Sequence, residues 1–318
     1  MNIFICRTIF QVYYAKTIIT EKKIEDVFFV YLAEKMNERE FFVLEKYIGE
    51  YNVIDGNGQL LRLLRQVKLL LLLKKIFKKN YGDLNLFFSS IDDLFIQTIL
   101  SLFDFNNIYT FDDGTANYIN NSIFFIDQKP GFKIRFKYKL MGNKIKGIDE
   151  VKAKIKKHYS SNNLPNIIAK ERVEYLPLAE FSVKDSNTNH LNYSAINVYL
   201  CPNFDEVYVD PDKVRKRFIS SLNHKDILIP HPRDNYCWKN NSSYVLYENT
   251  IAEAIVHDLI IKGYHVNLFG IANSTQYHYL NNSCVSNILL DIGTVKPCIA
   301  SIIKQQVELF KCLANTGS

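Results

Sequence analysis

Apolar runs and helix-like segments alternate regularly along the first third of the chain. Runs rich in aliphatic and aromatic residues predict buried strands at Ile3–Ile5, Val27–Leu32, Leu84–Ser89 and Ile108–Phe111, with a weaker one near Val53. The segments between them, at roughly 9–20, 34–49, 59–79 and 92–103, have helical spacing of apolar residues. Strands that alternate with helices pair in parallel through right-handed crossovers, which predicts a doubly wound α/β domain.

The same alternation returns in the last third of the chain. A polar stretch from Ser182 to Asn192 indicates a linker before it. Strands are predicted at Ile196–Leu200, Asp226–Ile229 and His265–Phe269, and helices at roughly 211–223 and 248–262. Because 318 residues suffice for two domains of ordinary size, we expect Rossmann-like domains over 1–190 and 191–318.

Composition indicates a globular protein, with 47% hydrophobic and 23% charged residues. The six cysteines lie far apart without zinc or dithiol spacing, so free thiols in a reducing cytoplasm are expected. The first residues run into a predicted strand rather than a secretory signal, and the longest apolar run, Leu69–Leu73, is too short to span a bilayer. We therefore expect a cytoplasmic protein.

Basic residues are concentrated in two segments. Arg62–Lys79 contains seven basic residues and no acidic one, and Lys129–Lys157 contains eleven against Asp149 and Glu150. Such segments suit an anionic membrane surface or a charged glycan, or they are solvated helix faces, and both interpretations stay open. No nucleic-acid partner is expected, because the segments lack a recognised binding motif.

Four polar clusters follow predicted strands, where ligands of parallel sheets bind. They are Asp112–Asn117 after Phe111, Pro202–Glu206 after Leu200, His231–Arg233 after Pro230, and Gly270–Thr275 after Phe269. Each alone has an ordinary explanation as a turn or a helix cap, and Asp210-Pro211-Asp212 is better explained as a cap than as a metal-binding pair. Their joint occurrence at strand ends in both domains favours a ligand-binding function.

This combination resembles the sialyltransferases of glycosyltransferase family 52, the lipooligosaccharide and capsule enzymes of bacteria. The similar segments are Cys6–Gln11, Phe111–Asn117, Tyr175–Leu178 and Pro230–Arg233. The resemblance implies the GT-B class, an α/β fold with two Rossmann-like, doubly wound domains facing across a cleft. It also places the donor nucleotide mainly on the second domain and the acceptor mainly on the first.

By the same resemblance, Asp205 matches the family's catalytic base and His231 the histidine that serves the departing phosphate. The implied substrate-binding residues are Thr8, Gln11, Asp112, Asp113, Gly114, Asn117, Pro232, Arg233, Gly270, Ser274 and Thr275. Asp113 remains an alternative base, since the corresponding motif carries it in another bacterial sialyltransferase family. Two segments depart from the pattern: Cys201–Phe204 lacks the relatives' glycine, and Ala272–Thr275 aligns loosely.

The expected activity is inverting, metal-independent transfer of sialic acid from CMP-sialic acid to a terminal galactose, in an α2,3 linkage. A carboxylate can accept the proton of the attacking hydroxyl, and histidine, arginine and hydroxyls can neutralise a single leaving phosphate without a metal or other cofactor. Homodimerisation and peripheral contact of segments 62–79 and 129–157 with the inner face of the membrane are further expectations. The alternatives are a GT-B enzyme for another nucleotide sugar and a non-catalytic protein that binds anionic glycan or membrane.

Overall fold

The chain divides into two compact units, Met1–Ala179 and Glu180–Ser318. The computed structural model describes residues 1–33, 36–55, 58–79, 83–119, 122, 124–125, 131–178, 194–231, 234, 236, 238, 244–247, 251–290 and 293–316. The expected linker at 182–192 lies outside this range. Among the described residues, no helix has the length and apolarity that crossing a bilayer requires.

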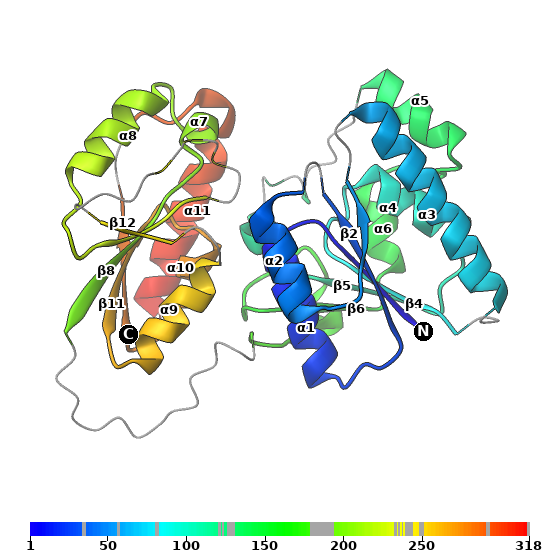
Figure 1. Cartoon of the computed structure of the whole chain (residues 1–318), viewed down its shortest axis with the longest axis horizontal. Helices are drawn as coiled ribbons and strands as arrows, with labels where there is room; N and C mark the ends of the chain where they lie inside the picture. Colours follow the sequence, from blue (N-terminus) through cyan, green and yellow to red (C-terminus); the bar gives the residue numbers. More distant parts are fainter. Residues whose placement is uncertain are drawn as a thin grey trace. The chain divides into compact units, whose positions relative to one another are not determined.

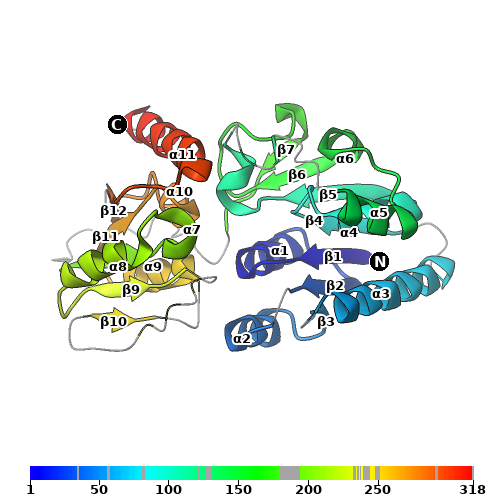
Figure 2. The ribbon, with the colours of Figure 1, turned by 90° about the horizontal axis from the view of Figure 1, so that it is seen from above.

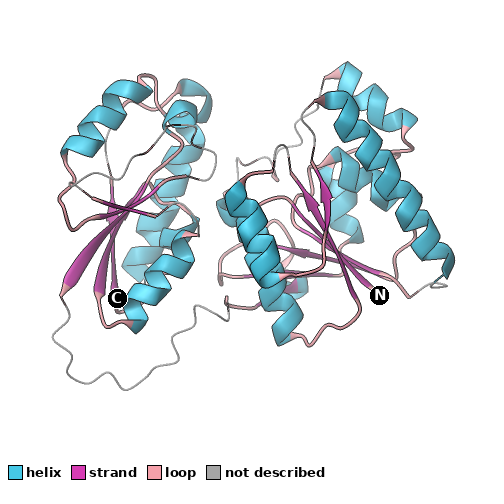
Figure 3. Cartoon of the chain, viewed as in Figure 1, coloured by secondary structure: helices cyan, strands magenta, loops and turns pink. Residues whose placement is uncertain are grey.

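Unit 1 is built on a seven-stranded parallel sheet with the order β3-β2-β1-β4-β5-β6-β7. The strands are β1 (Asn2–Cys6), β2 (Val27–Leu32), β3 (Asn52–Ile54), β4 (Asn85–Phe88), β5 (Asn107–Phe111), β6 (Lys157–Ser160) and β7 (Val173–Tyr175). Helices cover both faces of this sheet (Figure 1, Figure 3). They are α1 (Ile9–Glu21), α2 (Glu38–Tyr47), α3 (Gln59–Lys79), α4 (Leu94–Leu102), α5 (Phe132–Leu140) and α6 (Ile148–Lys154).

Alternation along the strands explains why both faces of the sheet are apolar. Ile3 and Ile5 of β1 belong to the core that Leu69 of α3 and Ile96 of α4 complete. Phe4 points to the opposite face, where its ring stacks on that of Phe87 at a centroid distance of 4.3 Å. The helices α1 and α2 lie on one side of the sheet and α3 to α6 on the other (Figure 2).

Unit 2 holds a five-stranded parallel sheet with the order β10-β9-β8-β11-β12. Its strands are β8 (Ala195–Leu200), β9 (Ile227–Ile229), β10 (Val245–Leu246), β11 (His265–Gly270) and β12 (Val285–Leu289). The helices are α7 (Phe204–Val207), α8 (Pro211–Ser220), α9 (Ala252–Ile261), α10 (Ser274–His278) and α11 (Pro297–Thr316). Val198 packs with Val256 of α9, whereas Tyr199 on the other face packs with Phe218 of α8.

Side-chain caps set where several helices begin. Asn37 and Glu40 form a reciprocal capping box at α2, and the Asp93 side chain accepts from the first backbone amides of α4. Asp210 caps α8 by accepting from Lys213 N at 3.2 Å, with Pro211 in the first turn. The sequence interpretation of Asp210 as a cap is therefore confirmed.

The expected fold class is confirmed at the level of two Rossmann-like α/β units. In each sheet the chain first adds strands on one side of the first strand, β1 or β8, and then continues on its other side, which is the strand order of a doubly wound fold. The predicted strands and helices are present, with α3 covering the whole predicted range 59–79. The structure adds β6, β7, α5 and α6 to unit 1, and β10, β12, α7, α10 and α11 to unit 2.

Candidate functional site

The three polar clusters of unit 2 lie at the carboxyl ends of adjacent strands. The strand β8 pairs with β9 on one side and with β11 on the other. The chain first proceeds from β8 to β9 and β10, and then returns to β11 across β8. Loops that leave the sheet at such a reversal form the usual ligand site of a doubly wound fold. The expected placement of Asp205, His231 and Gly270 at one edge is thus observed.

Asp205 lies in α7, the short helix that directly follows β8. Its side chain is 55% exposed, so the carboxylate is accessible to a ligand. One of its oxygens accepts a hydrogen bond from Arg215 Nη2 at 3.3 Å, and its backbone carbonyl accepts from Lys296 Nζ at 2.6 Å. The carboxylate is therefore both exposed and held in place.

Arg215 of α8 contacts Asp205 and was not predicted from the sequence. Its buried guanidinium also donates to Asp212 at 2.8 Å and lies 3.9 Å from Asp234, whose side chain is fully buried. The guanidinium faces the ring of Tyr236 at 4.3 Å from the centroid, a cation–π contact. The Asp-x-x-Arg spacing of Asp212 and Arg215 was a readable signal for a helix ion pair, but not for the contact with Asp205.

His231 follows β9 after Pro230 and is half-buried. Its backbone carbonyl accepts a hydrogen bond from Asp234 N at 2.9 Å, which connects this loop to the surroundings of Arg215. Pro232 and Arg233, also expected to bind substrate, lie outside the described residues. The described part therefore places one of the three residues of this motif.

The loop after β11 is fixed by the side chain of Gln276. Its Oε1 accepts from Ala272 N at 2.8 Å, and its Nε2 donates to Leu268 O and Ile288 O, both at 3.1 Å. Ala272 has a left-handed backbone with φ of +61°, and its carbonyl accepts from Gln306 Nε2. Strained residues held this firmly are concentrated at functional sites.

The predicted donor residues of this loop have different surroundings. Gly270 leaves no room for a side chain, since a Cβ there would lie 2.6 Å from Gln276 Oε1. Thr275 is buried and donates to Glu253 Oε1 at 2.8 Å, so its hydroxyl is bonded in the interior and does not face a ligand. Ser274 is half-buried and is the hydroxyl of this pair that reaches the surface.

In unit 1 a second polar cluster lies where the strand order reverses, between β1 and β4. Gln11 Nε2 donates to Ser90 Oγ at 3.2 Å, and Ser90 Oγ donates to Asp113 Oδ2 at 3.2 Å. Burial raises the pKa of the Asp113 carboxyl, while hydrogen bonds from Gln11 and Ser90 and the charge of Arg7 act in the opposite direction. The structure thus connects Gln11 and Asp113, which were both expected to bind substrate, through Ser90, which was not predicted.

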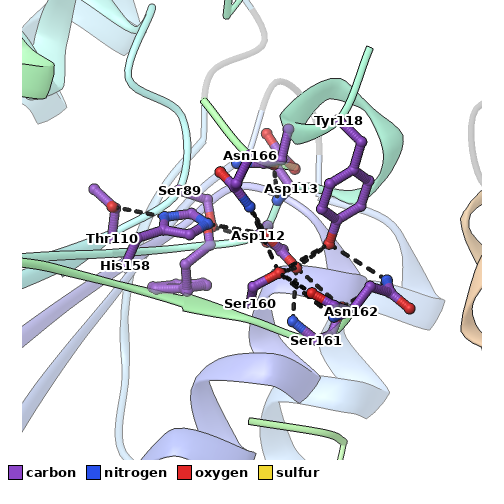
Figure 4. A network of polar contacts seen from close by, with 12 residues as sticks. Ser89, Thr110, Asp112, Asp113, Tyr118, His158, Ser160, Ser161, Asn162 and Asn166 are labelled. Carbon is purple, nitrogen blue, oxygen red and sulfur yellow. Dashed lines mark hydrogen bonds and ion pairs between the residues drawn. The ribbon is translucent and has the colours of Figure 1, made fainter. Parts of the chain in front are cut away.

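Asp112 occupies a different environment from its neighbour. It is fully buried and accepts from His158 Nε2 at 2.9 Å, from Ser161 N at 2.7 Å and from the Tyr118 hydroxyl. The hydrogen bonds in Figure 4 converge on this carboxylate and tie β5 to the loop after β6. Asp112, expected to bind substrate, therefore has no exposed surface for one, because adjacent residues at a strand end point in opposite directions.

The other predicted residues of unit 1 shape the loops around Asp113. Gly114 has φ of +75°, a conformation that favours glycine, and Asn117 Oδ1 accepts from Asp113 N at 2.7 Å while being fully buried. Thr8 is exposed and caps α1 by accepting from Gln11 N at 3.2 Å. Gly114 and Asn117 therefore orient Asp113, and Thr8 orients Gln11.

A further carboxylate, Asp92, lies in the loop after β4. Burial, followed by the charges of Asp93 and Asp113, raises the pKa of Asp92 to about 6, although Arg7 opposes this. The guanidinium of Arg7 pairs with Asp93 Oδ2 at 3.1 Å, while Asp93 also caps α4. A half-buried carboxylate with a raised pKa at a strand end is typical of functional sites.

Neither unit presents a protein-built metal centre among its described residues, where no group of three or more His, Cys, Asp and Glu side chains is arranged to hold an ion. The acidic residues of the two Asp pairs make other contacts. Asp112 is hydrogen-bonded in the interior, Asp210 caps a helix, and Asp212 pairs with Arg215.

Each Rossmann-like unit has polar side chains at the sheet edge where its strand order reverses. This arrangement defines the class of a two-unit α/β protein with ligand sites at the carboxyl ends of its strands. The model of glycosyltransferase family 52 matches residues 24–294. The chain belongs to this family.

Two relatives are bacterial enzymes. The chain is 31% identical over 244 residues to the CMP-N-acetylneuraminate:beta-galactoside alpha-2,3-sialyltransferase of Pasteurella multocida, a match that covers 74% of each chain. It is 30% identical over 182 residues to the N-acetyllactosaminide alpha-2,3-sialyltransferase of Haemophilus influenzae, covering 53% of this chain and 56% of the relative.

Solved structures that align with this chain are more distant in sequence. A UDP-N-acetylglucosamine 2-epimerase aligns with a TM-score of 0.45 at 11% identity, covering 98% of this chain and 86% of its own. The glycotransferase of kitacinnamycin aligns with a TM-score of 0.46 at 9% identity, covering 100% and 96%.

Proposed function

We propose that this chain is a sialyltransferase that moves sialic acid from CMP-sialic acid to a terminal galactose of a bacterial surface glycan, capsular polysaccharide or lipooligosaccharide, in an α2,3 linkage. The observation that carries the proposal is the match to the Pasteurella multocida relative, which extends over 74% of both chains and whose name states this donor, acceptor class and linkage. Membership of family 52 supports the same reaction type.

The donor is assigned to unit 2. In support, the exposed Asp205 and the half-buried His231 follow adjacent strands, and the fixed loop from Gly270 to Ser274 follows the next strand along. A histidine suits the phosphate of CMP because its N–H donates to anionic oxygen, and a serine hydroxyl adds a neutral donor. The acceptor is assigned to unit 1, where the half-buried Asp113 offers a carboxylate to sugar hydroxyls and the buried Gln11 and Ser90 hold that carboxylate in place.

In the proposed reaction, Asp205 takes the proton of the attacking galactose hydroxyl as its oxygen bonds to the anomeric carbon of sialic acid. The bond from that carbon to the phosphate oxygen breaks, and its electron pair leaves with CMP. His231 stabilises the charge that develops on the phosphate. Attack on the face opposite the leaving group converts the β-linked donor into an α-glycoside. Arg215 keeps the Asp205 carboxylate in position.

Metal independence is a separate part of the proposal, and a chelator tests it. The leaving group carries one phosphate, which His231 and neighbouring hydroxyls can neutralise. Excess EDTA should therefore leave the initial rate nearly unchanged. Loss of most activity, restored by Mg²⁺ or Mn²⁺, would contradict this assignment.

The function itself is tested by incubating the purified protein with CMP-sialic acid and lactose. CMP release should accompany a product whose mass has increased by one sialic acid, and linkage analysis should give α2,3. The control is a panel of UDP- and GDP-sugars, which should release no nucleotide. Turnover of one of those donors instead would indicate a transferase for another sugar, and CMP-sialic acid binding without turnover would indicate a non-catalytic protein.

We also propose that the protein acts in the cytoplasm, in contact with the inner face of the membrane through segments 62–79 and 129–157. Free cysteines support a reducing compartment, as no two of Cys6, Cys201, Cys284, Cys298 and Cys312 form a disulfide. A lipid-linked glycan acceptor would require such a location. A homodimer, implied by the resemblance, remains a proposal that gel filtration would test.

A further inference from the structure

Two neighbouring helices of unit 1 expose large apolar side chains to solvent. On α3, Leu60 is 72% exposed, and on α5, Phe132 is 82% and Leu140 is 73% exposed. The helices are in contact, since Gln66 Nε2 donates to the Tyr138 hydroxyl at 3.3 Å. Figures 1 and 2 show them side by side. We call the exposed side chains of α3 and α5 the α3–α5 surface.

The exposed apolar residues form helical stripes. On α3 the stripe is Leu60, Leu64, Val67 and Leu71, spaced so that all four share one face, while Gln66, Leu69 and Leu73 are buried on the other. On α5, Phe132, Phe136 and Leu140 follow one another at four-residue intervals, and α5 has no buried residue. Scattered exposed apolar residues are ordinary in soluble proteins, but contiguous stripes mark interaction sites.

Cations flank both stripes. The α3 segment carries seven basic residues and α5 carries Lys133, Arg135, Lys137 and Lys139, with no acidic residue in either helix. Arg65 is paired with Asp55. Desolvation, followed by the charge of Arg62, lowers the pKa of Lys137, so the cations of the two helices lie close enough to repel one another.

This combination of charge and apolarity distinguishes the occupants that could cover the surface. A second copy packed on the same face would bring these cations against an identical set, which is strongly unfavourable. A nucleic acid would neutralise the charge but would leave the leucine and phenylalanine stripes without a partner. A bilayer that contains anionic lipids supplies headgroups for the cations and an acyl boundary for the apolar side chains.

We propose that the α3–α5 surface is a membrane-binding face that inserts Phe132, Phe136 and Leu140 into the acyl boundary of an anionic bilayer, with the lysines at headgroup level. This deepens the membrane contact proposed above, and it does not depend on the identity of the sugar donor. The apolar insertion is the new element, because basic residues alone would give contact that salt abolishes.

Vesicle sedimentation tests the contribution of the apolar side chains. The triple variant Phe132→Ser, Phe136→Ser, Leu140→Gln should bind vesicles of phosphatidylcholine and phosphatidylglycerol about tenfold or more weakly at physiological salt than the unmodified protein. The matched control is Phe41→Ser, which removes a phenylalanine of similar exposure (53%) from the glutamate-rich helix α2 and should bind normally. Unchanged binding by the triple variant would overturn the proposal.

Fluorescence separates insertion from contact. The chain has a single tryptophan, Trp238, which is buried in unit 2. In Phe132→Trp the new indole should be quenched by brominated lipid acyl chains, whereas Trp238 in the unmodified protein and the new indole of Phe41→Trp should not. Absence of quenching in Phe132→Trp would show that the helix does not insert.

Two controls separate the membrane proposal from the proposed sialyltransferase function and from dimerisation. Turnover of CMP-sialic acid with lactose, which needs no membrane, should be unchanged in the triple variant, so loss of vesicle binding with retained turnover leaves the proposed function intact. If sedimentation shows that the unmodified protein is a dimer and the triple variant a monomer with unchanged vesicle binding, a second copy covers the surface and the proposal fails.

Discussion

At the residue scale, the single carboxyl group of Asp92 makes the stability of unit 1 depend on pH. Burial raises its pKa to about 6 in the folded protein, against about 4 in an unfolded chain. Because the folded state favours the protonated form, the stability from this group is fully present below about pH 4 and is lost as the pH rises past about 6. At neutral pH the ionised carboxylate therefore destabilises the fold.

Asp92→Asn should remove this pH dependence, because the amide has nearly the shape of the protonated acid. We expect the variant to be more stable than the unmodified protein at neutral pH, by up to about 3 kcal/mol for a pKa difference of about two units. At about pH 4 the two proteins should be equally stable. Urea unfolding at both pH values checks this, and an equal effect of the substitution at both would contradict it.

The two candidate bases are separated by another pair of substitutions. Asp205→Asn should lower turnover by about a hundredfold to ten-thousandfold while CMP binding is retained, since a general base acts on the hydroxyl and not on the donor. Asp113→Asn should instead raise the KM for the acceptor. Steady-state kinetics with calorimetric CMP titration checks both, and His231→Ala should lose turnover and CMP affinity together. Near-normal turnover in Asp205→Asn, with a folded but inactive Asp113→Asn, would assign the base to Asp113.

At the residue scale, sequence reasoning located the motifs but not the partners of their side chains. The order of residues after a strand brings Asp113 and Gln11 to one edge, and this was predictable. The burial of Asp112 depends on His158 and Ser160 of β6 and on Ser161 directly after it, all far along the chain from Asp112. Arg215 likewise reaches Asp205 only through the packing of α8 against α7, which no local pattern encodes.

At the element scale, the loop between β11 and α10 is specified by one glycine and one capping box. A Cβ on Gly270 would meet Gln276 Oε1 at 2.6 Å and Asn273 Nδ2 at 2.8 Å. Gln276 cannot move aside without losing its bonds to Ala272 N and Leu268 O, because it is completely buried. The Asn-x-x-Gln spacing of 273 and 276 was a readable capping-box signal.

Gly270→Ala should consequently destabilise unit 2 by about 1–3 kcal/mol, as overpacking of a filled site does. It should also weaken CMP binding, since the displaced loop is assigned to the donor. Gly131→Ala is the matched control: its Cβ would meet nothing within 4 Å, and its φ of −55° suits alanine. Thermal unfolding with and without CMP measures both effects, and equal behaviour of the two variants would refute the argument.

Strong apolar patterns explain which elements could be predicted. The strands β1, β2, β4 and β8 are nearly continuous apolar runs because both their faces are buried. The strands β6 (Lys-His-Tyr-Ser) and β12 (Val-Ser-Asn-Ile-Leu) carry polar residues, since β6 contributes to the Asp112 network and β12 lies at the sheet edge. Their pairing depends on tertiary hydrogen bonds, so the sequence pattern alone did not reveal them.

At the scale of the whole molecule, the proposed assignment of the donor to unit 2 and of the acceptor to unit 1 predicts which segments each ligand protects. Each unit has its own core, formed around Ile3, Phe88 and Ile96 in unit 1 and on both faces of β8 in unit 2. Each unit also has its own reversal of strand order and its own polar edge. Donor and acceptor should therefore protect different parts of the chain.

Hydrogen exchange on the full-length protein measures this division directly. Saturating CMP should slow exchange in the segments after β8, β9 and β11, around Asp205, His231 and Gly270, and leave the amides around Ser90 and Asp113 unchanged. At about a hundred times its Kd, a ligand that binds only the closed form suppresses local opening by about 2.7 kcal/mol, or roughly a hundredfold in rate. Lactose should give the complementary pattern, with protection near Gln11 and Asp113. Inorganic phosphate is the control for anion binding without the nucleoside. If CMP instead protects the loops of unit 1 and not those of unit 2, the assignment of the donor to unit 2 is wrong, even if the protein transfers sialic acid.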